Sequence, residues 1–380
     1  MTTTNTGQGT RKVPLLDLRP QNEPLQAEIE AAIGAVMRSQ HYILGADAKA
    51  FEQDMAAWLG VPHAIGCANG SDALVLALMA AGVGPGDEVA VPSFTFFATA
   101  GAVSRVGATP VFLDIDPLTF NLDPAALDEA AGRHPRLKAV IPVHLFGGAA
   151  DMDPILATAA RHGWSVIEDG AQSVGAAYKG KPCFGLGHMA TLSFFPSKNL
   201  GAFGDAGMVT TTSNELAVLL AALRVHGCRE KYKHEWIGFN SRMDTLQAAI
   251  LRVKLRHLAE WTSARQRNAA RYQEILGAAG LPITLPQPAP WQTNHVWNQF
   301  VIRSPRRDEL KAHLTAAGIG TEIYYPISLH RQPCYLPLGY AEGSLPESER
   351  TCREVLALPV HSGLNEGDIE YVAGAIRSFF

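Results

Sequence analysis

Short apolar runs alternate with helical patterns from about residue 63 to residue 211. The strand candidates lie at 89–91, 110–114, 139–143 and 165–168, and each ends near polar or turn-forming residues. The helix candidates between them lie at 71–81, 95–106, 124–131 and 153–162. Strand–helix–strand repetition predicts an α/β fold, in which helices cover both faces of a mainly parallel sheet. Ligands of such sheets bind beyond the carboxyl ends of the strands, where loops meet helix N-termini.

The C-terminal part of the chain shows a different pattern, which predicts a smaller α+β domain. A helical stretch from 244 to about 276 is broken near 261–263, and four prolines between 281 and 291 indicate a linker or an extended crossing. Further elements are expected as a strand at 296–302, a helix at 305–317 and a helix at 366–379. We predict a large domain at 14–260, with helices at 20–60 that pack with the small domain, a small domain at 261–380, and a flexible tail at 1–12.

Composition and charge argue against several classes of protein. The net charge of -4 and the pI near 6.4 give no electrostatic reason to expect a nucleic-acid partner. The longest purely apolar run, 216–223, is too short to span a membrane, and the N-terminus has no apolar signal-peptide core. The five cysteines are widely spread and form no CxxC pair, which argues against a disulfide framework or a metal site and favours the cytoplasm.

The sharpest chemical signal is the segment SFFPSKNLGAFGDAG at 193–207, which places Lys198 between an apolar run and a glycine-rich loop. Burial lowers the pKa of an amine and frees it to react with a carbonyl group. The glycines allow the backbone to approach a flat cofactor closely. A loop lysine that points into water explains the segment about equally well.

An acidic pair, Glu168 and Asp169, ends the apolar run at 165–168. A carboxylate at the end of a buried strand needs a cationic or hydrogen-bonding partner, and a protonated pyridine nitrogen is one such partner. An Asp that caps the following helix is the common alternative. We interpret Glu168 as structural.

A third candidate lies at 69–72, where the sequence NGSD directly precedes an apolar helix. Gly70 and Ser71 offer free backbone N–H groups, a hydroxyl and the positive end of the helix dipole, which together can hold a phosphate. An ordinary helix cap is the commoner explanation of this sequence alone. Phe96, beyond another strand, could cover the face of a ring, although core packing explains most phenylalanines.

The order of these signals is more specific than any one of them, because a phosphate cradle, an aromatic residue, an acid at a strand end and a lysine follow one another. The chain resembles the DegT/DnrJ/EryC1/StrS family of sugar aminotransferases from residue 14 to the last helix. The motifs that carry the resemblance are YILG at 42–45, GPGDE at 84–88, IPVHLFG at 141–147, FNSRMDTLQ at 239–247 and YPISLHRQP at 325–333.

The resemblance implies a fold-type I transferase that depends on pyridoxal 5′-phosphate (PLP), with a seven-stranded, mainly parallel sheet in its large domain. Lys198 matches the residue that carries the cofactor, and Asp169 matches the partner of its ring nitrogen. The other cofactor contacts implied are Gln172 near O3′, Phe96 stacked on the ring, and Gly70, Ser71 and Ser193 at the phosphate. Asn240 matches a residue that reaches the phosphate of the neighbouring subunit, which implies a homodimer with shared active sites. The residues implied on the substrate side are Arg242, Tyr325 and His330.

The activity implied is the transfer of an amino group from an amino acid, expected to be L-glutamate, to a keto group of a nucleotide-linked sugar, with C3 favoured over C4. A related sugar dehydratase is one alternative, but those relatives carry His in place of the lysine at 198. A regulatory protein without catalysis and an aminotransferase for small amino acids are two others. The chain departs from the family pattern at Gly170, where relatives have Ala, and at Tyr324, where relatives often have His.

Overall fold

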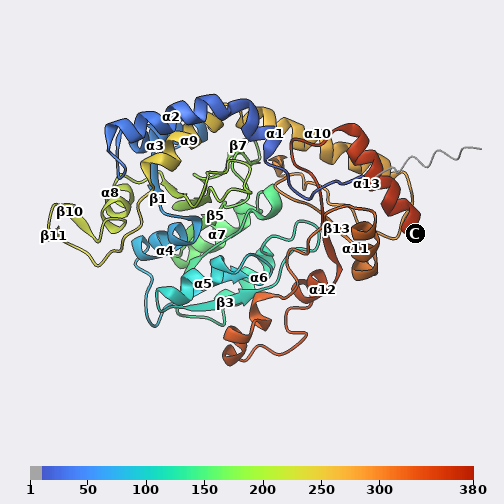
Figure 1. Cartoon of the computed structure of the whole chain (residues 1–380). Helices are drawn as coiled ribbons and strands as arrows, with labels where there is room; N and C mark the ends of the chain where they lie inside the picture. Colours follow the sequence, from blue (N-terminus) through green and yellow to red (C-terminus); the bar gives the residue numbers. More distant parts are fainter. Residues whose placement is uncertain (1–10) are drawn as a thin grey trace, which may run out of the picture.

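The computed structural model describes residues 11–380, so residues 1–10 of the predicted tail lie outside the described residues. A seven-stranded sheet forms the centre of the molecule (Figure 1), with the strand order β1-β9-β8-β5-β4-β2-β3. Its strands are β1 (His63–Cys67), β2 (Glu88–Pro92), β3 (Thr109–Leu113), β4 (Leu137–Val140), β5 (Ser165–Asp169), β8 (Met189–Ser193) and β9 (Gly207–Thr211). Strand β9 runs antiparallel to both neighbours, and the other pairs are parallel. The predicted mainly parallel, seven-stranded sheet is confirmed.

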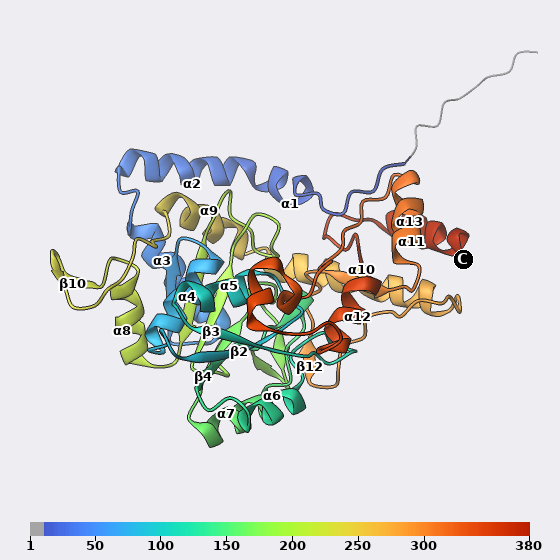
Figure 2. The same ribbon diagram turned by 90° about the horizontal axis from the view of Figure 1, so that it is seen from below.

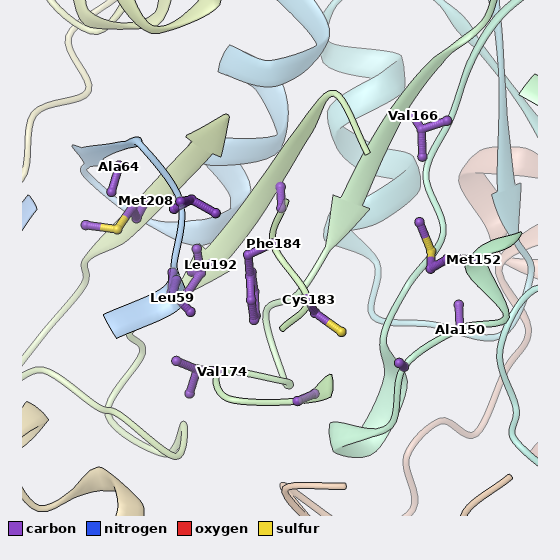
Figure 3. Close-up of a cluster of buried hydrophobic side chains, with 14 of the residues drawn as sticks. Leu59, Ala64, Ala150, Met152, Val166, Val174, Cys183, Phe184, Leu192 and Met208 are labelled. Atoms are coloured by element: carbon purple, nitrogen blue, oxygen red, sulfur yellow. The ribbon is translucent and has the colours of Figure 1, made fainter. Parts of the chain in front are cut away.

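Helices cover both faces of this sheet because its strands are apolar on both sides. One face packs against α3 (Ala46–Leu59), α6 (Pro124–Ala131), α7 (Met152–His162) and α9 (Thr245–Leu255). The other face packs against α4 (Gly70–Ala80), α5 (Ala98–Arg105) and α8 (Asn214–Leu223). Figure 3 shows part of the first core, which includes Phe184, Leu192 and Leu59.

The N-terminal helices pack mainly against α9. Helices α2 (Gln26–Ser39) and α3 both pack against α9, a helix of the predicted large domain (Figure 1). Ile29 of α2 also shares a buried cluster with Trp261, in the predicted small domain, so the expectation that helices at 20–60 pack with the small domain remains a prediction. The preceding chain does reach the C-terminal region, because Val13 pairs with Ile319 and Arg11 donates a hydrogen bond to Asp368. A short helix α1 (Arg19–Asn22) lies between the two regions.

The C-terminal region has a core of its own around a two-stranded antiparallel sheet. This sheet consists of β13 (Phe300–Arg303) and β14 (Val355–Leu358), and the helices around it are α10 (Leu258–Gly277), α11 (Arg307–Ala316), α12 (Pro346–Glu354) and α13 (Glu366–Phe379). Helix α10 contributes Leu258 to the core of the large sheet and Leu276 to the C-terminal core. A domain boundary at residue 260 therefore remains a prediction, because one continuous helix crosses it.

Two boundaries differ from the sequence-based expectation. The long helix breaks between α9 and α10 at residues 256–257, and not at 261–263. Ser263 stays helical, with its hydroxyl donating to the carbonyl of Ala259, and Trp261 is buried. Strand β13 begins at Phe300, because residues 296–299 follow an irregular path in which Trp297 has a φ of 47°.

Smaller sheets complete the described chain. Strands β6 (Ala177–Tyr178), β7 (Lys181–Pro182) and β12 (Gln292–Asn294) form a three-stranded sheet, and β10 (Cys228–Glu230) with β11 (Lys233–His234) forms a hairpin. The hairpin projects from the body of the molecule in two perpendicular views (Figures 1 and 2). Among residues 11–380, no helix combines the length and the apolar character that crossing a membrane requires.

Candidate active site

Lys198 lies in the loop between β8 and β9, close to the carboxyl end of the parallel strands. The loop folds back on itself, because Phe194 N–H donates to the carbonyl of Ala206 (2.8 Å) and Ala202 N–H donates to the carbonyl of Phe194 (2.8 Å). Burial lowers the pKa of the Lys198 amine to about 8, and the nearby Asp169 carboxylate opposes this shift. The interpretation as a lysine in open water does not fit this environment.

Asp169 ends β5 and is 4% exposed. Its Oδ2 accepts a hydrogen bond from Thr99 Oγ1 (2.8 Å), and its Oδ1 accepts one from Ala171 N–H (3.2 Å). Burial raises the pKa of Asp169 above its ordinary value. Within residues 11–380, no basic side chain lies within ion-pair distance of this carboxylate. Residues 170–176 form turns, so Asp169 does not cap a helix.

Glu168 points to the other side of β5 and has a structural role. Its carboxylate accepts hydrogen bonds from His144 Nε2 (2.9 Å) and from the N–H groups of Phe184 (3.0 Å), Leu186 (2.9 Å) and Gly187 (2.8 Å). Burial acts to raise the pKa of Glu168, but these hydrogen bonds outweigh it and lower the pKa. The carboxylate therefore fixes the loop at 184–187 to the back of the site.

The predicted phosphate cradle is assembled from three strand ends and one helix. Helix α4 begins at Gly70, and the Asn69 side chain caps it by accepting from Asp72 N–H (2.8 Å). Gly70 lies so close to the end of β8 that an added Cβ would come within 2.7 Å of Ser193 Cβ. Gly207 of β9 gives Asn69 room in the same way, because a Cβ there would lie 2.3 Å from the Asn69 carbonyl carbon. The free N–H groups of the first helical turn and two hydroxyl side chains, Ser71 and Ser193, thus come from neighbouring segments.

Gln172, Tyr325 and Phe96 form the opposite wall. Gln172 Oε1 accepts from Phe146 N–H (2.7 Å), and its Nε2 donates to Tyr325 Oη (3.1 Å). The ring of Phe96 is 57% exposed, and its centroid lies 6.2 Å from that of Tyr325. An exposed ring in this position is available to cover a flat ligand, and core packing does not explain it.

Asn240 and Arg242 lie just before α9, on either side of Ser241. The Ser241 hydroxyl accepts from Ala68 N–H (3.2 Å), which places this segment next to the cradle. Asn240 is exposed, and Arg242 is partly buried with its Nε lacking a hydrogen-bond partner within the described chain. Both residues are thus free to bind a group that this single chain does not supply.

His330 corrects a prediction, because the structure does not place it on the substrate side. The side chain is 0% exposed, with Nδ1 2.6 Å from Ser93 Oγ and Nε2 3.1 Å from Glu349 Oε1. Both ring nitrogens are occupied by the protein, so neither can contact a substrate. His330 instead fixes its segment to the end of β2, where Leu329 N–H also donates to the Ser93 carbonyl (2.7 Å).

The donors of this site fit a phosphorylated pyridine aldehyde. Asp169 is a buried carboxylate with no ion-pair partner among residues 11–380, and a protonated ring nitrogen supplies a cation. Lys198 is an amine with a lowered pKa, and the start of α4 with Ser71 and Ser193 suits a phosphate. One carboxylate, one amine and one anion cradle therefore match the three polar parts of PLP.

Comparison with known proteins decides the family. The model of the DegT/DnrJ/EryC1/StrS aminotransferase family matches residues 23–377. The chain belongs to this family. Its members are PLP-dependent aminotransferases, and this chain is one of them.

Individual members of the family are similar to this chain over nearly its whole length. A pleiotropic regulatory protein of Geobacillus stearothermophilus is 51% identical, over 97% of this chain and 98% of that protein. The dTDP-3-amino-3,4,6-trideoxy-α-D-glucose transaminase of Streptomyces venezuelae is 46% identical over 97% of each chain. The crystal structure of S. venezuelae DesV in complex with a ketimine intermediate superposes with a TM-score of 0.93 at 46% identity, covering 97% of this chain and 98% of that one. NtdA of Bacillus subtilis, solved with bound PMP, gives a TM-score of 0.90 at 32% identity, with 97% and 85% covered.

Two residues that shape the site, Thr99 and Phe184, were not predicted from the sequence. Thr99 donates to Asp169, but a threonine near a helix start carries no sequence signal of such a role. Phe184 lies against Gly170, where an added Cβ would come within 2.1 Å of Phe184 Cε1. A side chain at position 170 would therefore collide with the buried ring of Phe184 in this chain.

Proposed function

We propose that the chain transfers an amino group from an amino acid, L-glutamate, to the keto group at C3 of a nucleotide-linked sugar. The observation that carries the proposal is that the Lys198 amine and the Asp169 carboxylate are desolvated beside the same anion cradle. Relatives named for amino transfer to C3 of nucleotide sugars support the choice of substrate, among them the S. venezuelae transaminase and a UDP-2-acetamido-2-deoxy-3-oxo-D-glucuronate aminotransferase of Pseudomonas aeruginosa that is 42% identical.

Different residues of the chain would bind the cofactor and transfer protons. Bound PLP supplies an electron sink for negative charge that develops on the amino donor. Asp169 would keep the ring nitrogen of bound PLP protonated. Lys198 takes the proton from Cα of the amino donor and later delivers a proton to the sugar carbon that receives the amino group. A pKa of about 8 leaves a useful neutral fraction of the Lys198 amine at neutral pH. Gln172 and Phe96 orient the ring, while Gly70, Ser71 and Ser193 hold the phosphate.

We assign Arg242 and Tyr325 to the substrate side. Arg242 has an Nε with no hydrogen-bond partner in the described part of the chain, which suits the diphosphate or a carboxylate of a nucleotide sugar. The Tyr325 hydroxyl accepts a hydrogen bond from Gln172, and its ring lies near that of Phe96. Tyr325 would therefore border the face of the cofactor ring on which the substrate binds.

A spectrophotometric half-reaction tests the proposal. The protein, loaded with aminated cofactor, is mixed with 3-keto and 4-keto sugars linked to UDP, TDP or GDP, and we expect a 3-keto sugar to restore the absorbance of the aldehyde form. Lys198→Ala should abolish turnover, whereas Lys49→Met, at an exposed position on α3, should retain it. Normal transamination by Lys198→Ala, or no reaction with any keto sugar, would refute the assignment.

Two alternative functions are less well supported. A dehydratase of this fold requires His at position 198, and this chain has Lys. A regulatory protein without catalysis is suggested by the names of two relatives, the pleiotropic regulatory protein and a sensory transduction protein of Saccharopolyspora erythraea that is 44% identical. Such a protein does not need a desolvated amine beside a buried carboxylate, yet both are present here.

We further propose that the protein is a homodimer with shared active sites. Large apolar side chains are exposed in the segments 42–44, 96 and 195–203 and in and after the β10–β11 hairpin: Tyr42, Ile43, Leu44, Phe96, Phe195, Phe203, Tyr232 and Ile237. A second copy that covers them would remove a large apolar surface from water. In such a dimer the exposed Asn240 could bind the cofactor phosphate in the active site of the neighbouring subunit.

Mixing two inactive variants tests this arrangement. If Asn240 acts in the neighbouring site, Lys198→Ala and Asn240→Ala subunits should form mixed dimers in which one site has both residues intact. Random exchange yields half mixed dimers with one working site of two, so about a quarter of wild-type activity should return. No recovery after subunit exchange, verified by differential tagging, would contradict shared sites.

We also propose a cytoplasmic location for the protein. The five cysteines support this location, because all of them are free in the structure.

A further inference from the structure

The loop that carries Lys198 is fixed from behind by a neighbouring segment, residues 296–298. Asn199, the next residue after the lysine, is 2% exposed, and its Nδ2 donates to the carbonyl of Val296 (3.0 Å). Asn298 Nδ2 donates to Asn199 Oδ1 (2.8 Å). Both functional groups of the buried Asn199 amide are thus satisfied by one segment of distant sequence.

The same segment is held from its other side by Arg265 of α10. Arg265 Nη1 donates to the carbonyls of Trp297 (3.2 Å) and Asn298 (3.3 Å). Arg265 is buried, and no carboxylate of residues 11–380 lies within ion-pair distance of it. Burial lowers its pKa to about 10, so the guanidinium is still charged at neutral pH. A buried cation held by two backbone carbonyls favours one position of the segment over others.

The segment also supports the opposite wall of the site. Val296 N–H donates to the carbonyl of Gly147 (2.9 Å), and Phe146 N–H in turn donates to Gln172 Oε1 (2.7 Å). The backbones are in close contact, since a Cβ on Gly147 would lie 2.8 Å from Trp297 N. A displacement of residues 296–298 would therefore reach both the lysine loop and the residue assigned to O3′.

We propose that Asn298 is a positioning residue for Lys198. Its amide, held through the Arg265 contact, fixes Asn199 and the lysine-bearing loop, so that the amine remains buried beside Asp169. The inference rests on the proposed function in one respect, because it assumes that Lys198 is the residue that attaches the cofactor. Asp169 of β5 is the one ionisable group that acts on the Lys198 amine among the described residues.

The test uses cofactor-free protein and measures how fast added PLP attaches to Lys198, without an amino donor. Asn298→Leu removes the amide donor at similar side-chain volume. Gln292→Leu is the matched control: Gln292 is also a buried amide, with Nε2 donating to the carbonyl of Ala149 (2.8 Å) and Oε1 accepting from Ala289 N–H (3.0 Å). Attachment is followed by absorbance from pH 6.5 to 9.5, and hydrogen exchange by mass spectrometry reports on residues 194–203.

We expect Asn298→Leu to attach PLP more slowly at pH 7.5 and almost normally at pH 9.5. If a loosened loop admits water and the pKa of Lys198 rises by about one unit, the neutral amine fraction at pH 7.5 falls about eightfold. At pH 9.5 the same change leaves the rate within about twofold of the wild type. Hydrogen exchange across 194–203 should rise in Asn298→Leu, and Gln292→Leu should match the wild type in both measurements.

Several results would overturn the inference. Wild-type rates and exchange in Asn298→Leu would do so, and so would a loss that is equal at every pH, because a structural defect does not recover with deprotonation. If circular dichroism shows that Asn298→Leu is unfolded, Asn298→Ser, whose side chain is too short to reach Asn199, takes its place with the same criteria. Failure of the wild type to attach PLP at Lys198 would instead refute the proposed function itself.

Discussion

Lys254, on α9, provides a quantitative test of the electrostatics beneath the lysine loop. The side chain is 1% exposed, and no carboxylate of the described chain pairs with it. Its Nζ lies 5.3 Å from the ring centroid of Phe203 and 6.0 Å from that of Trp261. Burial lowers the pKa of this amine from 10.5 to about 8. We predict that Lys254→Met, which keeps the volume and removes the charge, stabilises the protein at pH 7.

The magnitude follows from the difference in pKa between the folded and unfolded states. A depression from 10.5 to about 8 corresponds to about 3.4 kcal/mol of destabilisation when the amine is protonated in the unfolded chain. Attraction between the ammonium and the two rings returns about 0.5–2 kcal/mol. The expected gain for Lys254→Met is therefore about 1–3 kcal/mol in the free energy of unfolding.

The pH dependence gives the sign an independent check. The unfolded state binds a proton at Lys254 up to about pH 10.5, and the folded state only up to about pH 8. The cost is thus complete below pH 8 and disappears as the pH rises toward 10.5, so the advantage of Lys254→Met should shrink in this window. Urea unfolding of the cofactor-free protein at pH 7 and pH 10, at one protein concentration, measures it. Lys49→Met, an exposed lysine on α3, should change stability by less than about 0.5 kcal/mol at either pH. A destabilised Lys254→Met at pH 7, or a difference that is the same at both pH values, would refute the reasoning.

Two further substitutions test the carboxylate and the strand end that carries it. Thr99→Val removes the hydroxyl that donates to Asp169 Oδ2, and because this hydrogen bond lowers the pKa of the carboxyl group, its loss should raise that pKa further. The acid limb of the kcat/KM profile should then move to higher pH, and the rate should fall about tenfold. An unchanged acid limb would contradict the role of Thr99. Gly170→Ala should destabilise by about 1–3 kcal/mol, because the buried Phe184 ring cannot move away from a Cβ 2.1 Å distant. Gly374→Ala, in α13, should stabilise by about 0.5–1 kcal/mol in thermal unfolding, because its added Cβ would meet no other element of the described chain within 4 Å. Equal effects at both positions would show that the contact with Phe184 is unimportant.

The sequence predicted those parts of the fold that depend on local pattern. The helix at 124–131 agrees with α6 to the residue, because Asp123 caps it and Pro124 begins it. The break in the long helix lies at 256–257 and not at the predicted 261–263, where Trp261 is buried and the helix continues. The projecting β10–β11 hairpin and α12 carried no clear signal and were not predicted.

The candidate site was predictable as a set of residue types, while the contacts between them were not. Lys198, Asp169 and Gly70 stand in motifs that are recognisable from the amino-acid sequence alone. His330 stands in such a motif as well, yet its ring is enclosed by Ser93 and Glu349. Sequence motifs identify segments near a site, but burial decides which side chain of a segment faces the ligand.

The order of strands explains why residues so far apart in sequence act together. Strand β8 lies between β5 and β9, so Asp169 at the end of β5 comes next to the loop that follows Ser193. Parallel pairing of β5 with β8 places both carboxyl ends at one edge, and the antiparallel return along β9 forces the intervening chain, with Lys198, to turn back across that edge. Such a turn lacks the regular hydrogen bonding of a strand or helix, so the position of the amine depends on contacts from outside the sheet. Asn199 and residues 296–298 supply those contacts, which is why the C-terminal region, although it contributes neither Lys198 nor Asp169, should control how reactive the lysine is.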